Sequence, residues 1–109
     1  MASYRSVTVY CSSSNSIDAA FIQAAKELGK SFAEHHVQLV NGGGRVGLMG
    51  EMARAVHEHG GRVVGVIPHA LKEIEGISYH ESDELILTDT MRERKRIMFE
   101  RSDAYVAMA

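Results

Sequence analysis

The sequence is poor in cysteine, proline and tryptophan and has no long apolar run, and these absences exclude several classes of protein. Its 109 residues include one cysteine, Cys11, one proline and no tryptophan, and no apolar run approaches the roughly 20 residues that span a bilayer. A lone cysteine excludes an internal disulfide and favours a reducing compartment. The net charge of −2 leaves neither sign in excess, so charge alone indicates neither nucleic acid nor a membrane as a partner. Because the first residues lack a signal-peptide pattern, we expect a cytoplasmic protein built as one compact domain.

Short β-branched runs alternate along the chain with segments of helical spacing. Strands separated by helices predict an α/β protein with a parallel sheet and right-handed crossovers. Ligands of such sheets bind beyond the carboxyl ends of the strands. Strands are expected at 7–11, 38–41, 62–67 (ended by Pro68), 84–88 and 104–108, helices at 17–32, 48–59 and 91–101, and mostly irregular structure at 69–83.

A dense glycine cluster lies between the second strand and the second helix, at Gly42, Gly43, Gly44, Gly47 and Gly50. A backbone without Cβ can approach a ligand closely, and the unpaired N–H groups at the start of a helix favour an anion. The loop therefore predicts a phosphate site. Two alternatives stay open. One is a dinucleotide enzyme, since the loop matches G-x-G-x-x-G although no acid follows the third strand; the other is a tight turn that only packs a helix on the sheet.

The segment after the fourth strand combines a helix start with unexpected charges. Thr90-x-x-Glu93 is a capping box, which predicts a helix beginning at the next residue. Cations on an apolar helix face need a partner, so this face indicates a bound anion. Alternatively the cations reach the surface or pair with a carboxylate. The side chains that share this face are Met91, Arg94, Lys95 and Met98.

Together these segments resemble the LOG family, whose members are cytokinin riboside 5′-monophosphate phosphoribohydrolases, formerly labelled possible lysine decarboxylases. The resemblance runs from Val7 to the last residue and implies a Rossmann-like three-layer fold with a parallel sheet and a homodimer. It also implies hydrolysis of the N-glycosidic bond of adenosine 5′-monophosphates, N6-modified ones included, without a cofactor or metal. It rests on Gly42-Gly43-Gly44-x-x-Gly47-Leu48-Met49-Gly50, Gly65-Val66-Ile67-Pro68, Met91-x-x-Arg94-Lys95-x-x-Met98 and Ser102-Asp103-Ala104.

The same resemblance assigns roles to individual residues. Arg94 matches the catalytic arginine of the family, Lys95 its neighbour in the substrate site, and Glu75 a substrate-binding glutamate. A carboxylate would stabilise the oxocarbenium-like ribose that forms as the base leaves, and Arg94 would orient that acid or hold the phosphate. The remaining residues implied to bind or flank the nucleotide are Gly42, Gly43, Gly44, Gly47, Ser13 and Ser14.

Departures from the family pattern bear on activity. Arg92 stands where the family has histidine, and Ser12 where it has glycine. Family members continue through Pro-Gly-Gly-x-Gly-Thr-x-x-Glu, which supplies a phosphate loop and the catalytic glutamate, whereas this sequence stops at Ala109. We therefore expect residues 1–109 to be the N-terminal part of a single Rossmann-like nucleotide-binding domain, incomplete on its C-terminal side and inactive by itself. The alternative is a nucleotide-binding module without catalysis.

Overall fold

The computed structural model describes residues 5–10, 19–44, 47–72 and 82–107. The strands and helices expected from the sequence are present there, with small shifts of their ends. In chain order the elements are β1 (Arg5–Tyr10), α1 (Ala19–Glu34), β2 (Val37–Asn41), α2 (Gly47–Glu58), β3 (Val63–Pro68), α3 (His69–Lys72), β4 (Glu84–Thr88), α4 (Met91–Glu100) and β5 (Ala104–Ala107).

In the middle of the chain the expectations misplaced Pro68 and missed a short helix. The third strand was expected to end at residue 67, but it includes Pro68, which pairs in register with Thr88 of β4. Residues 69–72 form the short helix α3 in the stretch 69–83, which was expected to be mostly irregular and of which residues 73–81 lie outside the described residues. A single turn of helix is too short to show a hydrophobic period, so the sequence carried no signal for it.

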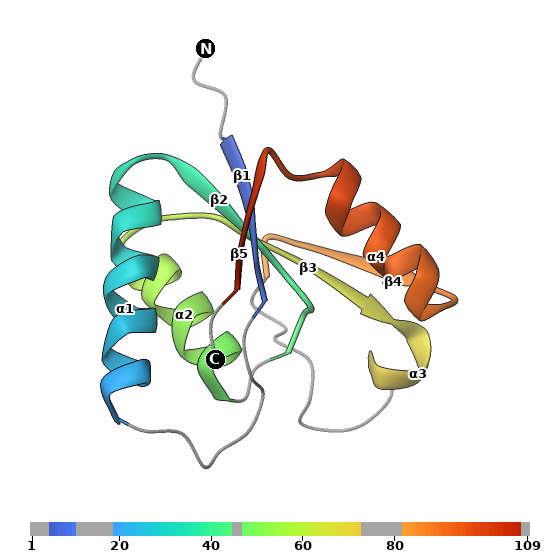
Figure 1. Ribbon diagram of the computed structural model, residues 1–109, viewed down its shortest axis with the longest axis horizontal. Coiled ribbons are helices and arrows are strands. Elements are labelled where there is room, and N and C mark those ends of the chain that lie inside the picture. The colour runs from blue at the N-terminus through green and yellow to red at the C-terminus, as the bar shows by residue number, and fades with distance from the viewer. Residues whose placement is uncertain (1–4, 11–18, 45–46, 73–81, 108–109) are drawn as a thin grey trace.

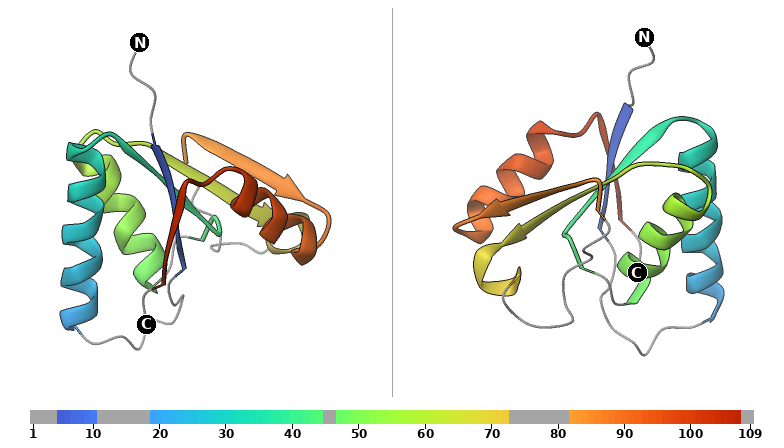
Figure 2. Two further views of the ribbon diagram at one scale, coloured as in Figure 1. Left: turned by 45° about the horizontal axis from the view of Figure 1, so that its top comes forward. Right: turned by 180° about the vertical axis from the view of Figure 1, so that it is seen from behind.

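All five strands run parallel in one sheet, in the order β4-β3-β2-β1-β5. Helices α1 and α2 cover one face of the sheet and α4 lies on the other, which makes three layers (Figures 1 and 2). The predicted parallel α/β architecture is therefore confirmed. After β4 the chain returns to the far side of β1, so the strand order reverses at β1. The crevice at the carboxyl end of such a strand is where open α/β sheets bind ligands.

Apolar side chains on the two faces of the sheet form separate clusters. The larger one lies under α1 and α2, and these helices approach closely at Gly29, where a Cβ would stand 2.9 Å from the Ala55 Cβ. The smaller one holds α4 against the sheet. The buried members of the larger cluster are Val9, Ala25, Phe32, Leu39, Leu48, Met52, Ala53, Val56 and Val63, and those of the smaller are Val40, Val64, Val66 and Met98.

Polar contacts fix both ends of α4. The Thr90 hydroxyl accepts a hydrogen bond from the Glu93 N–H at 3.0 Å, which confirms the predicted N-cap. Beyond the helix, the Asp103 N–H donates to the Ser6 carbonyl at 2.7 Å, and the Ser6 N–H donates to the Asp103 carboxylate at 2.8 Å. The buried Thr8 hydroxyl donates to the Met98 carbonyl at 3.3 Å. These bonds tie α4 to β1 and so set the position of its inner face.

Asp83 links the start of β3 to α2 and makes stability depend on pH. Its carboxylate accepts hydrogen bonds from His57 Nε2 at 2.8 Å and from the Val63 N–H at 2.7 Å. Burial alone would raise the pKa of Asp83, but these hydrogen bonds and the positive charges of His57 and Arg62 bring it below its usual 3.8. A carboxyl group with a lowered folded-state pKa stabilises the fold above its unfolded-state pKa, and the contribution disappears as the pH falls through the folded-state value.

We therefore expect the free energy of unfolding to fall as the pH drops below about 4. In the Asp83→Asn variant this part of the fall should be missing. Urea denaturation followed by circular dichroism across the acid range measures both proteins. An equally steep fall in the variant would show that Asp83 is not responsible.

None of the helices in the described part of the chain has the length and apolar character needed to cross a membrane.

Candidate functional site

A cavity of about 240 Å³ opens at the carboxyl ends of β1 and β2, between the glycine loop and α4. Four of its wall residues are those expected to share one face of the helix after the fourth strand, and that prediction is confirmed. The cavity therefore joins the two segments that the sequence singled out. Its lining residues are Val9, Tyr10, Gly42, Met49, Met91, Arg94, Lys95 and Met98.

Arg94 crosses from α4 to the ends of two strands. Its Nη2 donates to the Gly42 carbonyl at 2.7 Å, and its Nε donates to the Val66 carbonyl at 2.9 Å. Burial lowers the pKa of the Arg94 guanidinium, against a small opposing effect of Tyr10, but an arginine stays protonated in proteins. Within the described residues no carboxylate lies within 4 Å of it. A partly buried cation without a counter-charge is costly, so this position favours an anionic ligand.

The glycine loop is shaped around Arg94. A Cβ on Gly42 would stand 1.9 Å from Arg94 Nη2, so only glycine leaves room for the guanidinium. Gly43 has a φ of +78°, which glycine adopts without strain, and its N–H donates to the Asn41 side-chain oxygen at 2.8 Å. The Asn41 side-chain nitrogen is buried and has no hydrogen-bond partner among the described residues.

Asn41 and Met49 are residues that the sequence analysis missed. An asparagine directly before a turn is a recognised signal, because its side chain bonds the backbone two residues on. The Gly44 N–H donates to the Met49 sulfur at 3.1 Å. Nothing in the sequence indicated this contact, since a methionine at a helical position reads as part of the core.

The structure brings together part of the predicted site. Gly42, Arg94 and Lys95 line one cavity. The Gly44 N–H is hydrogen-bonded to Met49, which also lines this cavity. Gly47 is the first residue of α2 and has a φ of +64°. Their roles in binding or catalysis remain predictions. Three further predicted site residues lie outside the described residues: Ser13, Ser14 and Glu75.

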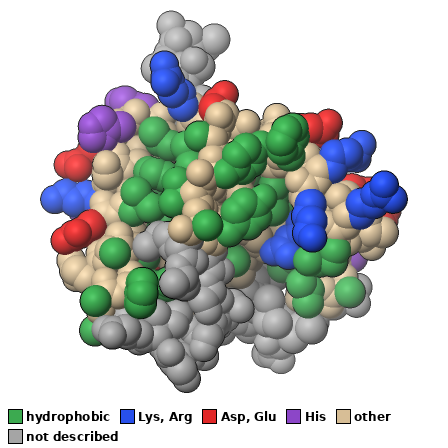
Figure 3. All heavy atoms as spheres, in the orientation of Figure 1, with side chains coloured by type: hydrophobic (Ala, Val, Ile, Leu, Met, Phe, Trp, Pro, Cys, Tyr) green, Lys and Arg blue, Asp and Glu red, His purple; other side chains and the backbone are tan. Residues whose placement is uncertain are grey.

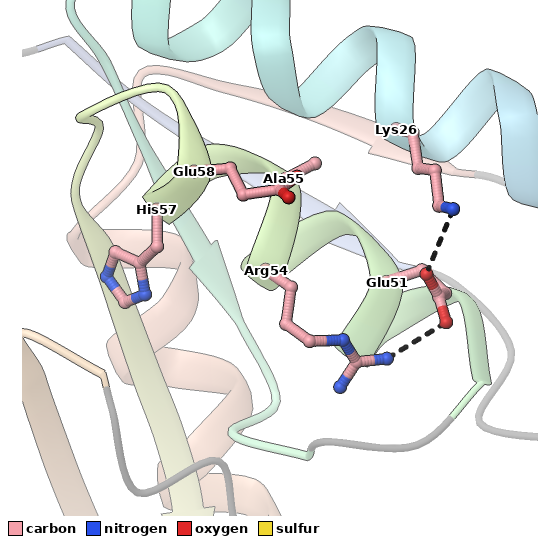
Figure 4. Close-up of a pocket in the computed structure, with 6 residues that line it drawn as sticks. All are labelled: Lys26, Glu51, Arg54, Ala55, His57 and Glu58. Atoms are coloured by element: carbon pink, nitrogen blue, oxygen red, sulfur yellow. Dashed lines mark hydrogen bonds and ion pairs between the residues drawn. The ribbon is translucent and has the colours of Figure 1, made fainter.

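A second cavity of about 450 Å³ is lined by side chains of α1 and α2 (Figure 4). Its charged side chains already compensate one another, because Glu51 lies 3.8 Å from Lys26 Nζ and 3.0 Å from Arg54 Nη2. Ala55 is the one apolar residue among the described residues that line this cavity, whereas ligand sites are mostly lined by apolar side chains with a few placed polar groups. This cavity is therefore the weaker candidate. It is lined by Lys26, Glu51, Arg54, Ala55, His57 and Glu58.

The surface around α4 is basic. Figure 3 shows Lys and Arg side chains gathered beside an apolar area on this side of the molecule. Three exposed cations project from α4, namely Arg92, Lys95 and Arg96. This charge favours the approach of anions toward the cavity. Among the described residues, no group of three or more His, Cys, Asp or Glu side chains could hold a metal ion.

Comparison with known sequences supports the LOG resemblance. The model of the SLOG cluster4 family matches residues 4–109. A rice protein named probable cytokinin riboside 5′-monophosphate phosphoribohydrolase is 47% identical over 107 residues, covering 96% of this chain and 46% of the rice protein. A Mycobacterium tuberculosis cytokinin riboside 5′-monophosphate phosphoribohydrolase is 46% identical over 102 residues, covering 94% of this chain and 54% of that protein. The chain thus spans about half the length of the curated relatives it matches.

Solved structures show the same fold. The molybdenum cofactor carrier protein of Chlamydomonas reinhardtii superposes with a TM-score of 0.80 at 28% identity, over 98% of this chain and 65% of that one. The molybdenum cofactor binding protein of Rippkaea orientalis gives a TM-score of 0.77 at 20% identity, over 98% of this chain and 64% of that one. At that identity the second likeness concerns the fold alone.

Proposed function

Because the chain belongs to the SLOG cluster4 family, we propose that it supplies the nucleotide-binding part of a phosphoribohydrolase. The enzyme cleaves the N-glycosidic bond of adenosine 5′-monophosphate or its N6-modified forms. Water is consumed, and the base and ribose 5-phosphate are released. In this proposal the residues act together with the family's Pro-Gly-Gly-x-Gly-Thr-x-x-Glu segment, and the 109 residues alone bind nucleotide without hydrolysing it.

The observation that carries the proposal is Arg94, a partly buried guanidinium with no carboxylate beside it among the described residues. It stands in a cavity at the carboxyl ends of the strands, next to a glycine loop. A nucleoside monophosphate brings the anion that this site needs. The names of the relatives, which act on cytokinin riboside 5′-monophosphates, support an adenosine-type base.

In the proposed reaction, carboxylates and cationic side chains have different roles. As the bond between ribose and base breaks, the electron pair leaves with the base and positive charge develops on the ribose. Glutamates would stabilise that charge and activate the water. We assign these two roles to Glu75 and to the glutamate of the Pro-Gly-Gly-x-Gly-Thr-x-x-Glu segment. Arg94 would hold the phosphate or orient an acid, while Lys95 adds positive charge at the cavity wall. A homodimer, as the family resemblance implies, belongs to the same proposal.

Release of adenine from AMP, followed by chromatography, tests the proposal. We expect none from the 109-residue chain. A chimera in which residues 1–109 are followed by the C-terminal part of the Mycobacterium tuberculosis relative should release adenine, because the added part brings the second glycine loop and the glutamate of the family pattern. Adenine release by the 109-residue chain above the enzyme-free background would contradict its proposed inactivity. A folded chimera that releases base from neither AMP nor N6-isopentenyl-AMP would contradict the hydrolase.

The second candidate is a nucleotide-binding module without catalysis. It is favoured by the likeness to the Chlamydomonas molybdenum cofactor carrier protein, whose TM-score is 0.80 at 28% identity. The two candidates differ in one observable. A carrier binds its nucleotide and releases it unchanged, so a chimera that binds AMP without turnover supports this reading.

A further inference from the structure

We propose that Met49 and Met91 hold the two donors of an anion subsite with their sulfur atoms, and that a phosphoryl oxygen displaces both sulfurs on binding. The donors are the Gly44 N–H and the Nη1 of Arg94. The identity of the ligand as a nucleotide phosphate rests on the proposed function, whereas the subsite itself concerns binding and is tested without hydrolysis.

Two hydrogen bonds to sulfur carry the inference. The Gly44 N–H donates to the Met49 Sδ at 3.1 Å, and Arg94 Nη1 donates to the Met91 Sδ at 3.8 Å. Both methionines line the same cavity as Arg94. A thioether is only a weak acceptor, so each of these two N–H donors makes only a weak hydrogen bond. Both donors therefore keep most of their capacity for a better acceptor.

The neighbouring donors are treated differently. The Gly43 N–H is held by the Asn41 side-chain oxygen at 2.8 Å, and Arg94 Nε and Nη2 are held by the Val66 and Gly42 carbonyls at 2.9 and 2.7 Å. These oxygen partners fix the loop and the guanidinium in place. By contrast, the Gly44 N–H and Arg94 Nη1 have sulfur partners, and the two methionines that supply these sulfurs line the cavity. The site thus combines a rigid frame with two exchangeable contacts.

A phosphoryl group suits these donors. Backbone N–H groups of a glycine-rich loop that precedes a helix and arginine N–H groups both bind phosphate oxygens, and hydrogen bonds with an ionised donor or acceptor are about twice as strong as neutral ones. Methionine has three rotatable bonds and tolerates repacking, so the two side chains can move aside at little cost. The cavity would then accept the anion between the glycine loop and α4, with the displaced thioethers contributing to its apolar wall.

Leucine substitutions test the displacement. Met49→Leu and Met91→Leu keep the volume of the side chain but remove the acceptor. Because each variant has one sulfur contact fewer to lose, inorganic phosphate and AMP should bind about two- to tenfold more tightly to it, measured by calorimetry on the 109-residue chain. Met52→Leu is the matched control, since Met52 is buried in the larger apolar cluster and is not one of the described residues that line the cavity. Unchanged or weaker phosphate binding in both leucine variants would overturn the inference.

Methyl-labelled methionine gives a second readout that does not depend on a variant. In ¹³C NMR spectra the methyl signals of Met49 and Met91 should shift on addition of inorganic phosphate or AMP. Met52, fully buried under α1, should not respond. A response to AMP but not to free phosphate would still support the subsite and restrict it to nucleotides. An equal response to adenosine, which lacks the anion, or no response to AMP at saturating concentration would refute it. Failure of hydrolysis in the chimera would leave this result unaffected.

Discussion

An Arg94→Ala variant of the chimera is expected to lose at least about a hundredfold in kcat for AMP hydrolysis, the usual cost of removing one preorganised donor to a transition state. The guanidinium is partly buried in the cavity and has no carboxylate partner among the described residues. Its loss therefore removes a partly buried positive charge from the cavity. Adenine release at saturating AMP measures the effect, and binding of AMP measured separately shows how much of it arises before the chemical step.

Two variants sharpen this result. Arg96→Ala removes an exposed cation from the same helix, outside the cavity, and should leave kcat within about twofold because surface charges contribute little. Arg94→Lys keeps the charge but cannot hold the Gly42 and Val66 carbonyls with a planar fork, so its activity should remain well below that of the unaltered chimera. An Arg94→Ala chimera that turns over AMP at an unchanged rate would rule out the assigned role.

Gly42→Ala should disable the site while sparing the fold. The added Cβ would lie 1.9 Å from Arg94 Nη2. This atom ends a flexible side chain, so the guanidinium moves and the backbone stays. We expect the affinity for AMP to fall about tenfold or more, and the free energy of unfolding to fall by about 1–3 kcal/mol, as hydrogen bonds to a charged group are lost. Calorimetry and urea denaturation measure the two effects on the 109-residue chain.

Gly60→Ala is the control for Gly42→Ala, because it introduces backbone strain without a clash with Arg94. Gly60 has a φ of +80°, and a Cβ there would meet nothing within 4 Å. This substitution should therefore cost about 1–2 kcal/mol of stability through its left-handed backbone and leave AMP affinity unchanged. If Gly42→Ala binds AMP as tightly as the unaltered chain, the contact between Arg94 and the loop carbonyl does not position the site.

The comparison between sequence and structure shows which features are local. The capping box at Thr90 and Glu93 identified the start of α4, since the contact spans three residues. The shared face of Arg94 and Lys95 followed from helical geometry alone. The alternation of strands and helices predicted a parallel sheet, because short connections and right-handed crossovers leave few other arrangements. Pro68 and α3 were misjudged where local patterns are short or depend on pairing with a neighbouring strand.

The sequence by itself therefore determined the class of fold, the glycine loop and the odd cations of one helix face. Only the tertiary structure decided that Arg94 bonds Gly42, 52 residues away, and Val66, 28 residues away. It also decided that sulfur atoms hold the Gly44 and Arg94 donors that meet the cavity wall. These contacts arise because the strand order brings the ends of β2 and β3 under α4. Periodicity along a chain reports which side of an element faces inward, but the partner that it meets there is set by the packing of distant segments.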